Sequence, residues 1–183
     1  MSQVARWRKL GRVFGPAGEA PWMQSHAAVP IAEHLHDDLF RIYFSSRDAS
    51  NRSFTGSLVV DITDPTRVID LSTQPVLVPG GLGEFDDSGA MATWLTQVNG
   101  SRHLYYIGWN LGVTVPFRNS IGLATSSAPG IDFVRYASGP IVDRTMQEPH
   151  FCASCCVLQD ADIFRMWYLA CTGWQLRQGR PEH

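Results

Sequence analysis

The residues best suited to chemistry are acids that recur at a fixed interval along the chain. Asp86 and Glu148 are 62 residues apart (148 − 86), and each begins an apolar run. The same interval separates Arg41, His103 and Arg165 (103 − 41; 165 − 103), which lie in three similar stretches of aromatic and aliphatic residues. A period of this length with β-rich content is typical of a repeated sheet unit, whose equivalent residues lie around a common axis. Acids at the same phase are therefore expected to converge on one place.

Convergent acids are what the cleavage of a glycosidic bond requires. One carboxylic acid protonates the leaving oxygen, and it stays protonated near neutral pH when a second carboxylate or a desolvated site raises its pKa. Glu148 is the candidate acid, with Asp86 and Asp87 as its candidate partners. The alternative is structural. Asp86 and Asp87 would then accept backbone N–H bonds in their loop, and Glu148, just before Pro149, would lie in an ordinary turn.

Each repeat reads as up to four short strands separated by turn residues. In the first repeat we expect strands at 25–31, 39–46, 53–62 and 67–78, and in the second at 90–98, 103–109, 120–126 and 133–136. The third repeat starts at Glu148 and supplies two strands, at 151–158 and 164–171. Asn99-Gly100 is a typical hairpin turn between the first two strands of the second repeat.

The predicted fold class is all-β, because no long stretch keeps a helical period. Four-stranded antiparallel sheets around an axis form a propeller, and 183 residues supply about two and a half blades. The prediction is one incomplete propeller domain over 1–183, with an N-terminal segment at 1–21, blades at 22–83 and 84–145, and a partial blade at 146–183. We therefore expect either a longer protein or further blades from another chain. An open blade edge would favour self-association.

The composition argues against nucleic acid and membrane partners. The formal charge is −2, and the basic cluster at 6–9 is short enough to be a solvated strand edge. The sequence offers no apolar window of membrane-spanning length and no apolar segment after its basic start, so a cytoplasmic location is expected. Cys152, Cys155, Cys156 and Cys171 lie in apolar runs without the turn of a zinc knuckle. We expect buried free thiols, no metal and no cofactor.

Residues at two phases of every repeat should gather on one rim. Neighbouring strands of a blade are antiparallel, so the start of the first strand and the end of the second lie at the same end of the sheet. A sugar site would use Arg for a hydroxyl, carboxylate or phosphate, and a Trp face for stacking on the ring. The expected substrate-binding residues are His26, Arg47, Asp48, Trp109, Asn110, Arg118, His150 and Trp174. The polar hairpin tip at 34–38 should lie at the opposite end.

Several of these residues have a structural alternative. Arg47 and Asp48 could form a loop ion pair, and His26 could be a hydrogen-bonded structural residue. Trp109 and Trp174 could pack between sheets, as aromatic residues of blades commonly do. These alternatives stay open at the level of sequence.

The order and spacing of several motifs resemble those of a known group of proteins. The motifs are His26-Ala-Ala-Val-Pro30, Arg41-Ile-Tyr-Phe-Ser-Ser-Arg-Asp48, Gly83-Glu-Phe-Asp-Asp-Ser-Gly89, Tyr105-Tyr-Ile-Gly-Trp-Asn110, Ile121-Gly-Leu-Ala-Thr-Ser126 and Met166-Trp-Tyr168. From about Trp22 onward the chain resembles the five-bladed propeller glycosidases. The likeness is greatest to uncharacterised proteins related to glycoside hydrolase families 32, 43 and 130, including the propeller region attached to some plant glycosyltransferases. It implies a partial five-bladed β-propeller.

The resemblance also implies roles for the acids. In the resembling hydrolases a third-blade acid is the proton donor and a second-blade Asp tunes its pKa, which points to Glu148 and to Asp86 or Asp87. Such hydrolases place the catalytic base at the start of the first blade. Positions 24–26, reached by subtracting 62 from 86–88, hold Gln, Ser and His, so this base is missing there.

Two routes could replace the missing base. Asp48 could reach in from the adjacent loop and activate water. Phosphorolysis, as in family 130, needs one acid and a basic phosphate pocket, which His26, Arg47 and Arg118 could supply. The expected protein is therefore carbohydrate-active, cleaving a glycosidic bond by hydrolysis or phosphorolysis, with a carbohydrate or sugar phosphate as partner. The alternative is a non-catalytic sugar-binding or scaffold propeller associated with a glycan-biosynthetic enzyme.

Overall fold

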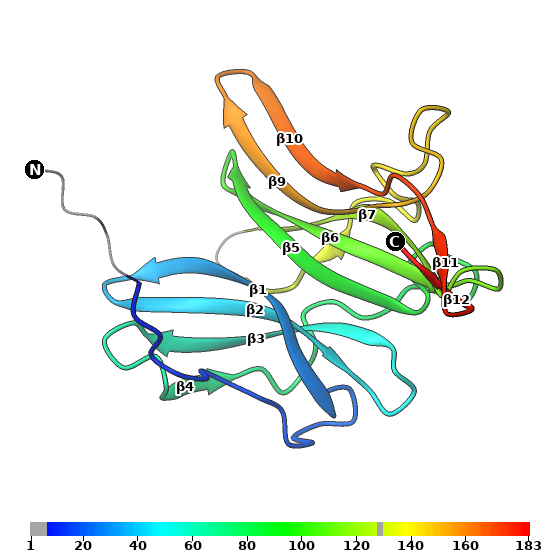
Figure 1. The fold of residues 1–183 in the computed structure, drawn as a ribbon. Helices are drawn as coiled ribbons and strands as arrows, with labels where there is room; N and C mark the ends of the chain where they lie inside the picture. The colour runs from blue at the N-terminus through cyan, green and yellow to red at the C-terminus, as the bar shows by residue number, and fades with distance from the viewer. Residues whose placement is uncertain (1–6, 128–129) are drawn as a thin grey trace, which may run out of the picture.

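The computed structural model describes residues 7–127 and 130–183, in which every regular element is a β-strand (Figure 1). The strands are β1 (Ser25–His36), β2 (Leu39–Arg47), β3 (Ser53–Asp61), β4 (Val68–Leu71), β5 (Gly89–Val98), β6 (Ser101–Leu111), β7 (Phe117–Ser127), β8 (Val134–Arg135), β9 (Cys152–Asp160), β10 (Ile163–Ala170), β11 (Gln175–Arg177) and β12 (Arg180–Glu182). The all-β prediction is confirmed. None of the described residues forms a helix that could span a membrane. Arg6, which opens the basic cluster, lies outside them.

The strands form blades arranged side by side. Strands β1 to β4 form one antiparallel unit, blade 1, and β5 to β8 form a second, blade 2. β9 and β10 form the antiparallel pair expected for the third repeat, here called blade 3. A single parallel bridge between Ser53 and Gly89 joins blades 1 and 2. β5 lies against both β1 and β9, so the first strands of the blades are neighbours at the centre (Figure 1). This is the predicted partial β-propeller.

Two details of the strand prediction were wrong. The strand expected at 67–78 is limited to β4, followed by an isolated bridge between Thr55 and Leu77. The short hairpin of β11 and β12 was not anticipated. Both misses concern short elements whose pairing depends on neighbouring strands more than on a local period.

The 62-residue repeat has a structural counterpart. Arg41, His103 and Arg165 are each the third residue of the second strand of their blade. The prediction that they occupy equivalent positions is therefore confirmed at the level of strand position. The repeat in sequence is a repeat of the blade.

Two glycines make room for aromatic rings at matching points of blades 1 and 2. Gly56 in β3 pairs with Phe44, and Gly122 in β7 pairs with Tyr106. A Cβ at Gly56 would lie 2.6 Å from the Trp22 ring, and a Cβ at Gly122 would overlap the Tyr106 ring. Only glycine leaves space for these rings at the two positions.

The core lies mainly between blades. The cluster that joins blades 1 and 2 consists of Tyr43, Val76, Leu77, Ala90, Ala92, Leu104, Tyr106, Ala124 and Phe133. Two further clusters join blades 2 and 3, one around Tyr105 and Val157 and the other around Ile107 and Phe151. Each large side chain buried in this way contributes about 1.5–3 kcal/mol relative to exposure. Blade packing is therefore the main source of the stability of the fold.

Thr55 connects blades 1 and 2 through its side chain. It lies in β3 with no exposed surface, and its hydroxyl donates to the Ala90 carbonyl at 2.9 Å. The same hydroxyl accepts the Ala92 N–H at 3.0 Å. One side chain thus supplies hydrogen-bond partners for two backbone groups of β5. These groups lie on the side of β5 that has no neighbouring strand of blade 2.

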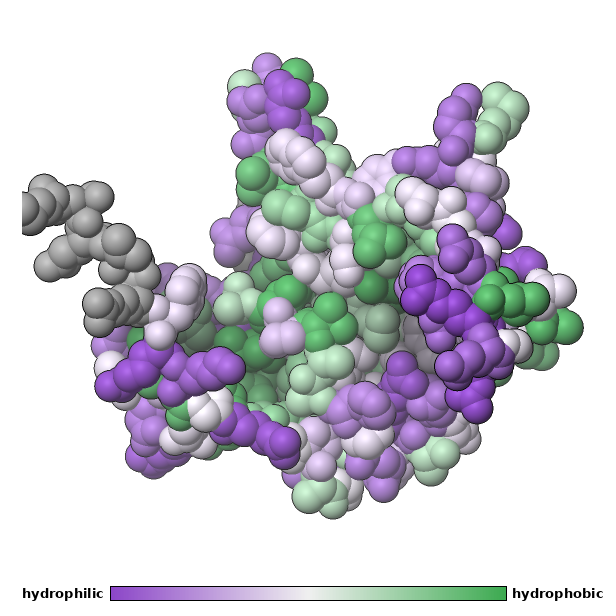
Figure 2. Space-filling view, in the orientation of Figure 1, coloured by the Kyte–Doolittle hydropathy of each residue, from purple (hydrophilic) through white to green (hydrophobic). Residues whose placement is uncertain are grey.

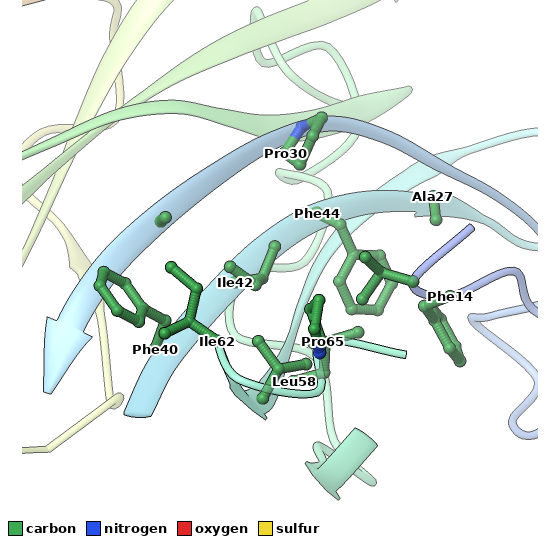
Figure 3. Close-up of a pocket in the computed structure, with 12 residues that line it drawn as sticks. Phe14, Ala27, Pro30, Phe40, Ile42, Phe44, Leu58, Ile62 and Pro65 are labelled. Carbon is green, nitrogen blue, oxygen red and sulfur yellow. The ribbon is translucent and has the colours of Figure 1, made fainter. Parts of the chain in front are cut away.

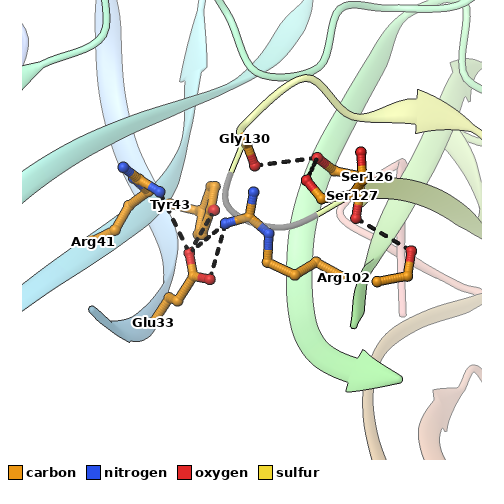
Figure 4. Close-up of polar contacts among 8 residues, drawn as sticks. Glu33, Arg41, Tyr43, Arg102, Ser126, Ser127 and Gly130 are labelled. Carbon is orange, nitrogen blue, oxygen red and sulfur yellow. Dashed lines mark hydrogen bonds and ion pairs between the residues drawn. The ribbon is translucent and has the colours of Figure 1, made fainter. Parts of the chain in front are cut away.

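A buried charged group also joins blades 1 and 2, near the end of β1 and the start of β6 (Figure 4). Glu33 of β1 accepts from Tyr43 at 2.8 Å and from Arg102 of β6 at 3.0 Å, and Arg41 lies 3.7 Å away. The side chains of Glu33 and Arg102 are 8% and 3% exposed. The guanidinium of Arg102 also lies 5.3 Å from the Phe133 ring centre. Burial, followed by the charge of Glu33, raises the pKa of Tyr43 far above its ordinary value.

Apolar surface remains open at both ends of the row of blades. On blade 1, a cavity of about 470 Å³ is lined by aromatic and aliphatic side chains of β1, β2 and β3, with Phe14 beside it (Figure 3). On blade 3, Ile163, Phe164 and Trp167 of β10 are exposed. Figure 2 shows hydrophobic side chains gathered in the hollowed middle of one face, with hydrophilic ones around it. The expected self-association through an open blade edge stays a prediction.

Replacing Thr55 with valine should destabilise the contact between blades 1 and 2. Valine keeps the shape and removes the hydroxyl, so the Ala90 carbonyl and the Ala92 N–H lose a buried partner. We expect a loss of about 2 kcal/mol in the free energy of unfolding, measured by chemical denaturation. Thr55→Ser should restore most of it, and Thr172→Val at an exposed site should change little. Equal stability of Thr55→Val and the parent would contradict this role.

The stability of the protein should fall at alkaline pH, in part because of Tyr43. Its folded-state pKa lies above the value of about 10 in the unfolded chain, so its contribution is complete below that pH and is lost as the pH rises above it. Tyr43→Phe should therefore make the decline shallower, by up to about 1.4 kcal/mol per pH unit once the pH exceeds about 10, measured by denaturation between about pH 9 and 11. Tyr136→Phe, at an exposed tyrosine, should leave the slope unchanged. Identical slopes for Tyr43→Phe and the parent would refute the prediction.

Candidate functional site

One continuous row of paired residues crosses blades 1 and 2 at the rim that the sequence predicts. Ser25 pairs with Arg47, Arg47 with Ser53, and Ser53 with Gly89. Gly89 in turn pairs with Trp109. The starts of β1 and β5 therefore lie beside the ends of β2 and β6, as expected from antiparallel pairing. In blade 3 the start of β9 likewise lies beside the end of β10.

A first cavity on this rim brings Asp87 and Asn110 together. It has a volume of about 470 Å³ and is lined by Arg52, Gly80, Leu82, Asp87, Ser88, Asn110 and Leu111. The Asp87 carboxylate accepts the Gly83 N–H at 3.0 Å and the Ser88 hydroxyl at 2.9 Å. The loop-capping alternative is thus realised for Asp87, which still lines the cavity. Its carboxylate can accept a further hydrogen bond from a hydroxyl there.

A second cavity brings Arg118, His150 and Trp174 together. Its volume is about 170 Å³, and the other lining residues are Thr114, Val115, Phe117, Arg144, Pro149 and Phe151. The rings of Phe117, Phe151 and Trp174 lie 5.4–5.6 Å apart, centre to centre. Trp174 is therefore both part of an aromatic cluster and part of the cavity wall.

The two cavities lie on either side of the β6–β7 hairpin. Leu111 lines the first cavity, and its cross-strand partner Phe117 lines the second. Asn110 and Arg118 are related in the same way. Opposed residues of antiparallel strands have Cα atoms about 5 Å apart, so the two cavities adjoin. Five of the predicted site residues are placed on this part of the rim.

Asp86 has a different environment from the one that its candidate role requires. The side chain has no exposed surface, and Oδ2 accepts from Arg135 at 2.7 and 2.9 Å and from the Tyr106 hydroxyl at 3.1 Å. Arg135 also donates to the Val78 carbonyl at 2.6 Å. Burial, followed by the charge of Asp86, raises the pKa of Tyr106 far above its ordinary value. The Asp86 carboxylate therefore holds blade 2 to the segment that follows blade 1, and in this structure it does not face the rim.

Glu148 lies in a turn and is held by a tyrosine. Its N–H donates to the Thr145 hydroxyl at 3.0 Å, and its carbonyl accepts the Thr145 N–H at 3.0 Å, so the turn expected by the structural alternative is present. Its carboxylate accepts the Tyr168 hydroxyl at 2.7 Å, and this hydrogen bond raises the pKa of Tyr168. The next two residues, Pro149 and His150, line the second cavity. Asp86, Asp87 and Glu148 thus occupy three separate environments.

The tyrosine partners of the two acids were missed at the level of sequence. Tyr106 and Tyr168 are 62 residues apart (168 − 106), the interval that separates Asp86 and Glu148. Each acid lies 20 residues before its tyrosine. The phase of the repeat was therefore a signal that could have found both pairs. Arg144, the additional cation of the second cavity, carries no such signal.

Trp109, Arg47 and Asp48 depart from the predicted arrangement. Trp109 is only 8% exposed, so the packing alternative is correct for it, and the guanidinium of Arg47 lies 5.8 Å from its ring centre. Asp48 pairs with Arg52 at 2.9 Å, whereas Arg47 donates to Asn51 at 2.7 Å. The predicted loop ion pair exists for Asp48 with a different arginine. A local run cannot tell which of two nearby arginines turns back toward a carboxylate.

His26 lies apart from the two adjoining cavities. It lines a separate cavity with Arg12, Gln24 and Ser25, and its Nδ1 lies 2.8 Å from the Ser25 hydroxyl. Arg118 belongs to the second cavity, so the phosphate pocket expected from His26, Arg47 and Arg118 is not assembled as one group. The hairpin tip at 34–38 is formed as expected, with His34 Nε2 2.9 Å from the Asp37 carbonyl.

The cysteines are free thiols in the structure. Cys152, Cys155 and Cys171 are buried, and burial raises the pKa of the Cys155 thiol to about 11. The described residues hold no cluster of three or more His, Cys, Asp or Glu side chains with metal-binding geometry. The cysteines of β9 therefore act as small apolar residues of the core.

The fold is a partial β-propeller, and the solved structures that it resembles include glycoside hydrolases. It is similar to a glycosyl hydrolase from Bacteroides ovatus (TM-score 0.61, 19% identity, 83% of this chain and 46% of that one). A second Bacteroides ovatus protein assigned to the glycoside hydrolases gives a TM-score of 0.64 at 17% identity, over 95% of this chain and 52% of that one. A family 117 glycoside hydrolase of Zobellia galactanivorans gives 0.52 at 16% identity, over 91% and 46%. Identities this low establish the fold alone.

In sequence, the chain is similar to two uncharacterised proteins of Mycobacterium tuberculosis, from strains CDC 1551/Oshkosh and ATCC 25618/H37Rv. Each is 45% identical over 168 residues, which are 92% of this chain and 56% of the relative. The chain therefore spans little more than half the length of these relatives. No protein-family model matches it.

Replacing Asp86 should affect stability far more than replacing its neighbour Asp87. Asp86→Asn leaves the partly buried Arg135 guanidinium without its counter-charge, for which we expect a loss of about 3 kcal/mol in the free energy of unfolding. Asp87→Asn keeps a hydrogen-bond acceptor in a surface loop and should cost under about 1 kcal/mol. Denaturant unfolding of both variants tests this. Equal effects of the two substitutions would show that Asp86 does not hold the blades together.

Proposed function

We propose that this chain is part of a carbohydrate-active protein that binds a saccharide on the described rim and cleaves a glycosidic bond. The observation that carries the proposal is the gathering of five predicted site residues in two adjoining cavities. Asp87 and Asn110 offer acceptors and donors for sugar hydroxyls, and Trp174 offers an aromatic wall. The glycoside hydrolase-like fold supports the same class of ligand.

In this proposal Glu148 is the proton donor. It directly precedes Pro149 and His150 of the second cavity, and the Tyr168 hydroxyl fixes its carboxyl group at 2.7 Å. Of the two candidate aspartates of blade 2, we assign the role of second acid to Asp87, because it lines the first cavity. Asp86 is a positioning residue, because its hydrogen bonds to Arg135 and Tyr106 hold the loop in which Asp87 is the next residue. Hydrolysis and phosphorolysis both fit one donor on this rim.

The proposal includes the blade boundaries of the sequence analysis, at 22–83, 84–145 and 146–183, within a larger propeller. The greater length of the two Mycobacterium relatives supports this, because the chain covers 56% of each. A catalytic base at the start of blade 1 is not supplied by residues 24–26. Asp48 is engaged with Arg52 at 2.9 Å, so a base from blade 1 would require that ion pair to open.

A second candidate function is a non-catalytic sugar-binding or scaffold propeller associated with a glycan-biosynthetic enzyme. One observation favours it. Glu148 and Tyr168 repeat the pair of Asp86 and Tyr106, which is buried and structural. If Glu148 has the same task in blade 3, the rim binds sugar without cleaving it. The two candidates differ in what a substitution of Glu148 changes.

Glu148→Gln should lower turnover by about a hundredfold or more if Glu148 protonates the leaving oxygen. Glutamine keeps the size and the acceptor for Tyr168, so the fold should be retained. The loss should be larger for an alkyl glycoside than for an activated aryl glycoside, because the poorer leaving group depends more on protonation. The assay uses the full-length protein, with hydrolysis and sugar-1-phosphate formation followed separately.

Asp160→Asn, at an exposed hairpin residue paired with Arg165, is the matched control and should leave turnover unchanged. Unchanged turnover of both glycosides in Glu148→Gln would exclude Glu148 as the acid. The binding module would instead be favoured by two results together. The parent protein would show no measurable cleavage, and Glu148→Gln would have a lower free energy of unfolding than the parent.

A further inference from the structure

The second cavity is lined by an excess of basic side chains. Three of its lining residues, Arg118, Arg144 and His150, are basic or can become cationic, and none of its lining residues is acidic. The chain as a whole has a formal charge of −2. The positive charge is therefore a local property of the junction between blades 2 and 3.

The two arginines remain available to a ligand. Arg118 is exposed and takes part in no ion pair among the described residues. Arg144 Nε lies 3.6 Å from Asp143 Oδ1, which is longer than a hydrogen bond, and Asp143 also accepts the Ser120 hydroxyl at 2.8 Å. The remaining N–H groups of both guanidinium ions can donate to an anion in the cavity. Arginine presents these donors in a planar fork that matches carboxylate and phosphate oxygens.

An aromatic cluster forms the apolar side of the cavity. Trp174 packs on Phe117 at 5.4 Å and on Phe151 at 5.6 Å, so its ring is fixed by residues from blade 2 and blade 3. His150 lines the same cavity, and a Cβ added at Gly173 would lie 3.9 Å from its Nε2. The cations are thus presented beside a fixed aromatic wall.

The size of the cavity limits what it can hold. Its 170 Å³ corresponds to roughly five or six water molecules, which is enough for one charged substituent but not for an oligosaccharide. The larger first cavity adjoins it across the β6–β7 hairpin. A sugar ring bound over the hairpin could therefore place one substituent in the second cavity.

We propose that the cavity formed by Arg118, Arg144, His150 and Trp174 binds the anionic group of an acidic saccharide, a carboxylate or a phosphate carried on a sugar ring. This inference rests on the proposed carbohydrate function and specifies its substrate class. The guanidinium groups bind the oxyanion, and Trp174 contacts the apolar face of the ring that carries it. Neutral sugars lack the carboxylate or phosphate group that these cations would bind.

Binding of four probes tests the proposal: glucuronate, glucose 6-phosphate, inorganic phosphate and glucose, each titrated into the full-length protein by calorimetry and by tryptophan fluorescence. We expect at least one of the two acidic sugars to bind roughly tenfold or more tightly than glucose, and more weakly as salt is raised. Arg118→Gln and Arg144→Gln should each weaken that binding about tenfold, whereas Arg118→Lys should retain part of it. Arg67→Gln, at an exposed loop residue of blade 1, is the control and should have no effect.

The outcomes separate the sources of the anion. Preference for glucuronate identifies a carboxylate, and preference for glucose 6-phosphate together with binding of inorganic phosphate identifies a phosphate. Equal affinity for glucose and both acidic sugars, or equal losses in Arg118→Gln and Arg67→Gln, overturns the proposal. Folding of each variant is checked by its denaturation midpoint.

This test is independent of cleavage. The Glu148 carboxyl group is not part of the cavity wall, so anion binding and cleavage are measured separately. If the parent protein does not prefer acidic sugars but its cleavage depends on Glu148, the anion-binding proposal alone is refuted. Retained anion binding without cleavage would remove the catalytic proposal alone.

Discussion

Polar groups that are buried between blades must find partners, and this requirement fixes how blades 1 and 2 sit against each other. Asp86 pairs with Arg135 near one end, Glu33 pairs with Arg102 near the other, and the Thr55 hydroxyl lies between them, so each of these buried side chains has a polar partner. Apolar packing tolerates small shifts, whereas a buried charge that loses its partner costs several kcal/mol. These contacts therefore specify the register between blades, while the surrounding apolar residues supply most of the stability.

The rim inherits its geometry from that register. Because Ser53 is bridged to Gly89, the end of β2 and the start of β5 meet at the same height, and the loop with Asp87 lies next to Asn110. The β6–β7 hairpin then separates a larger cavity with mixed polarity from a smaller basic one. A saccharide that spans the hairpin would encounter hydrogen-bonding groups on one side and positive charge on the other. The hydrogen-bonding groups thus lie where blades 1 and 2 meet, and the basic groups lie where blades 2 and 3 meet.

The sequence predicts the parts of this structure that depend on periodicity. Strand positions, the blade repeat and the common rim follow from alternation, the 62-residue interval and antiparallel pairing. Burial of individual side chains does not follow, because it depends on residues far along the chain: Asp86 is covered by Arg135, which comes 49 residues later. Trp109 was misjudged for a similar reason, since Arg47 from blade 1 lies over its ring. A carboxylate at the correct phase can therefore be a structural anchor or a rim residue.

The pairing of an acid with a tyrosine in two blades bears on how the repeats diverged. At the equivalent positions of blade 1, found by subtracting 62 from 86 and from 106, stand Gln24 and Phe44, so that blade has neither the carboxylate nor the hydroxyl. In blade 2 both side chains are buried, so loss of the Asp86 carboxylate alone would leave the Tyr106 hydroxyl without its partner. A blade with the acid and the tyrosine can therefore change into a blade with neither only by two substitutions. The form with a single substitution is less stable. Copies of a duplicated unit can remain distinct on such a path even without any difference in the ligands they bind.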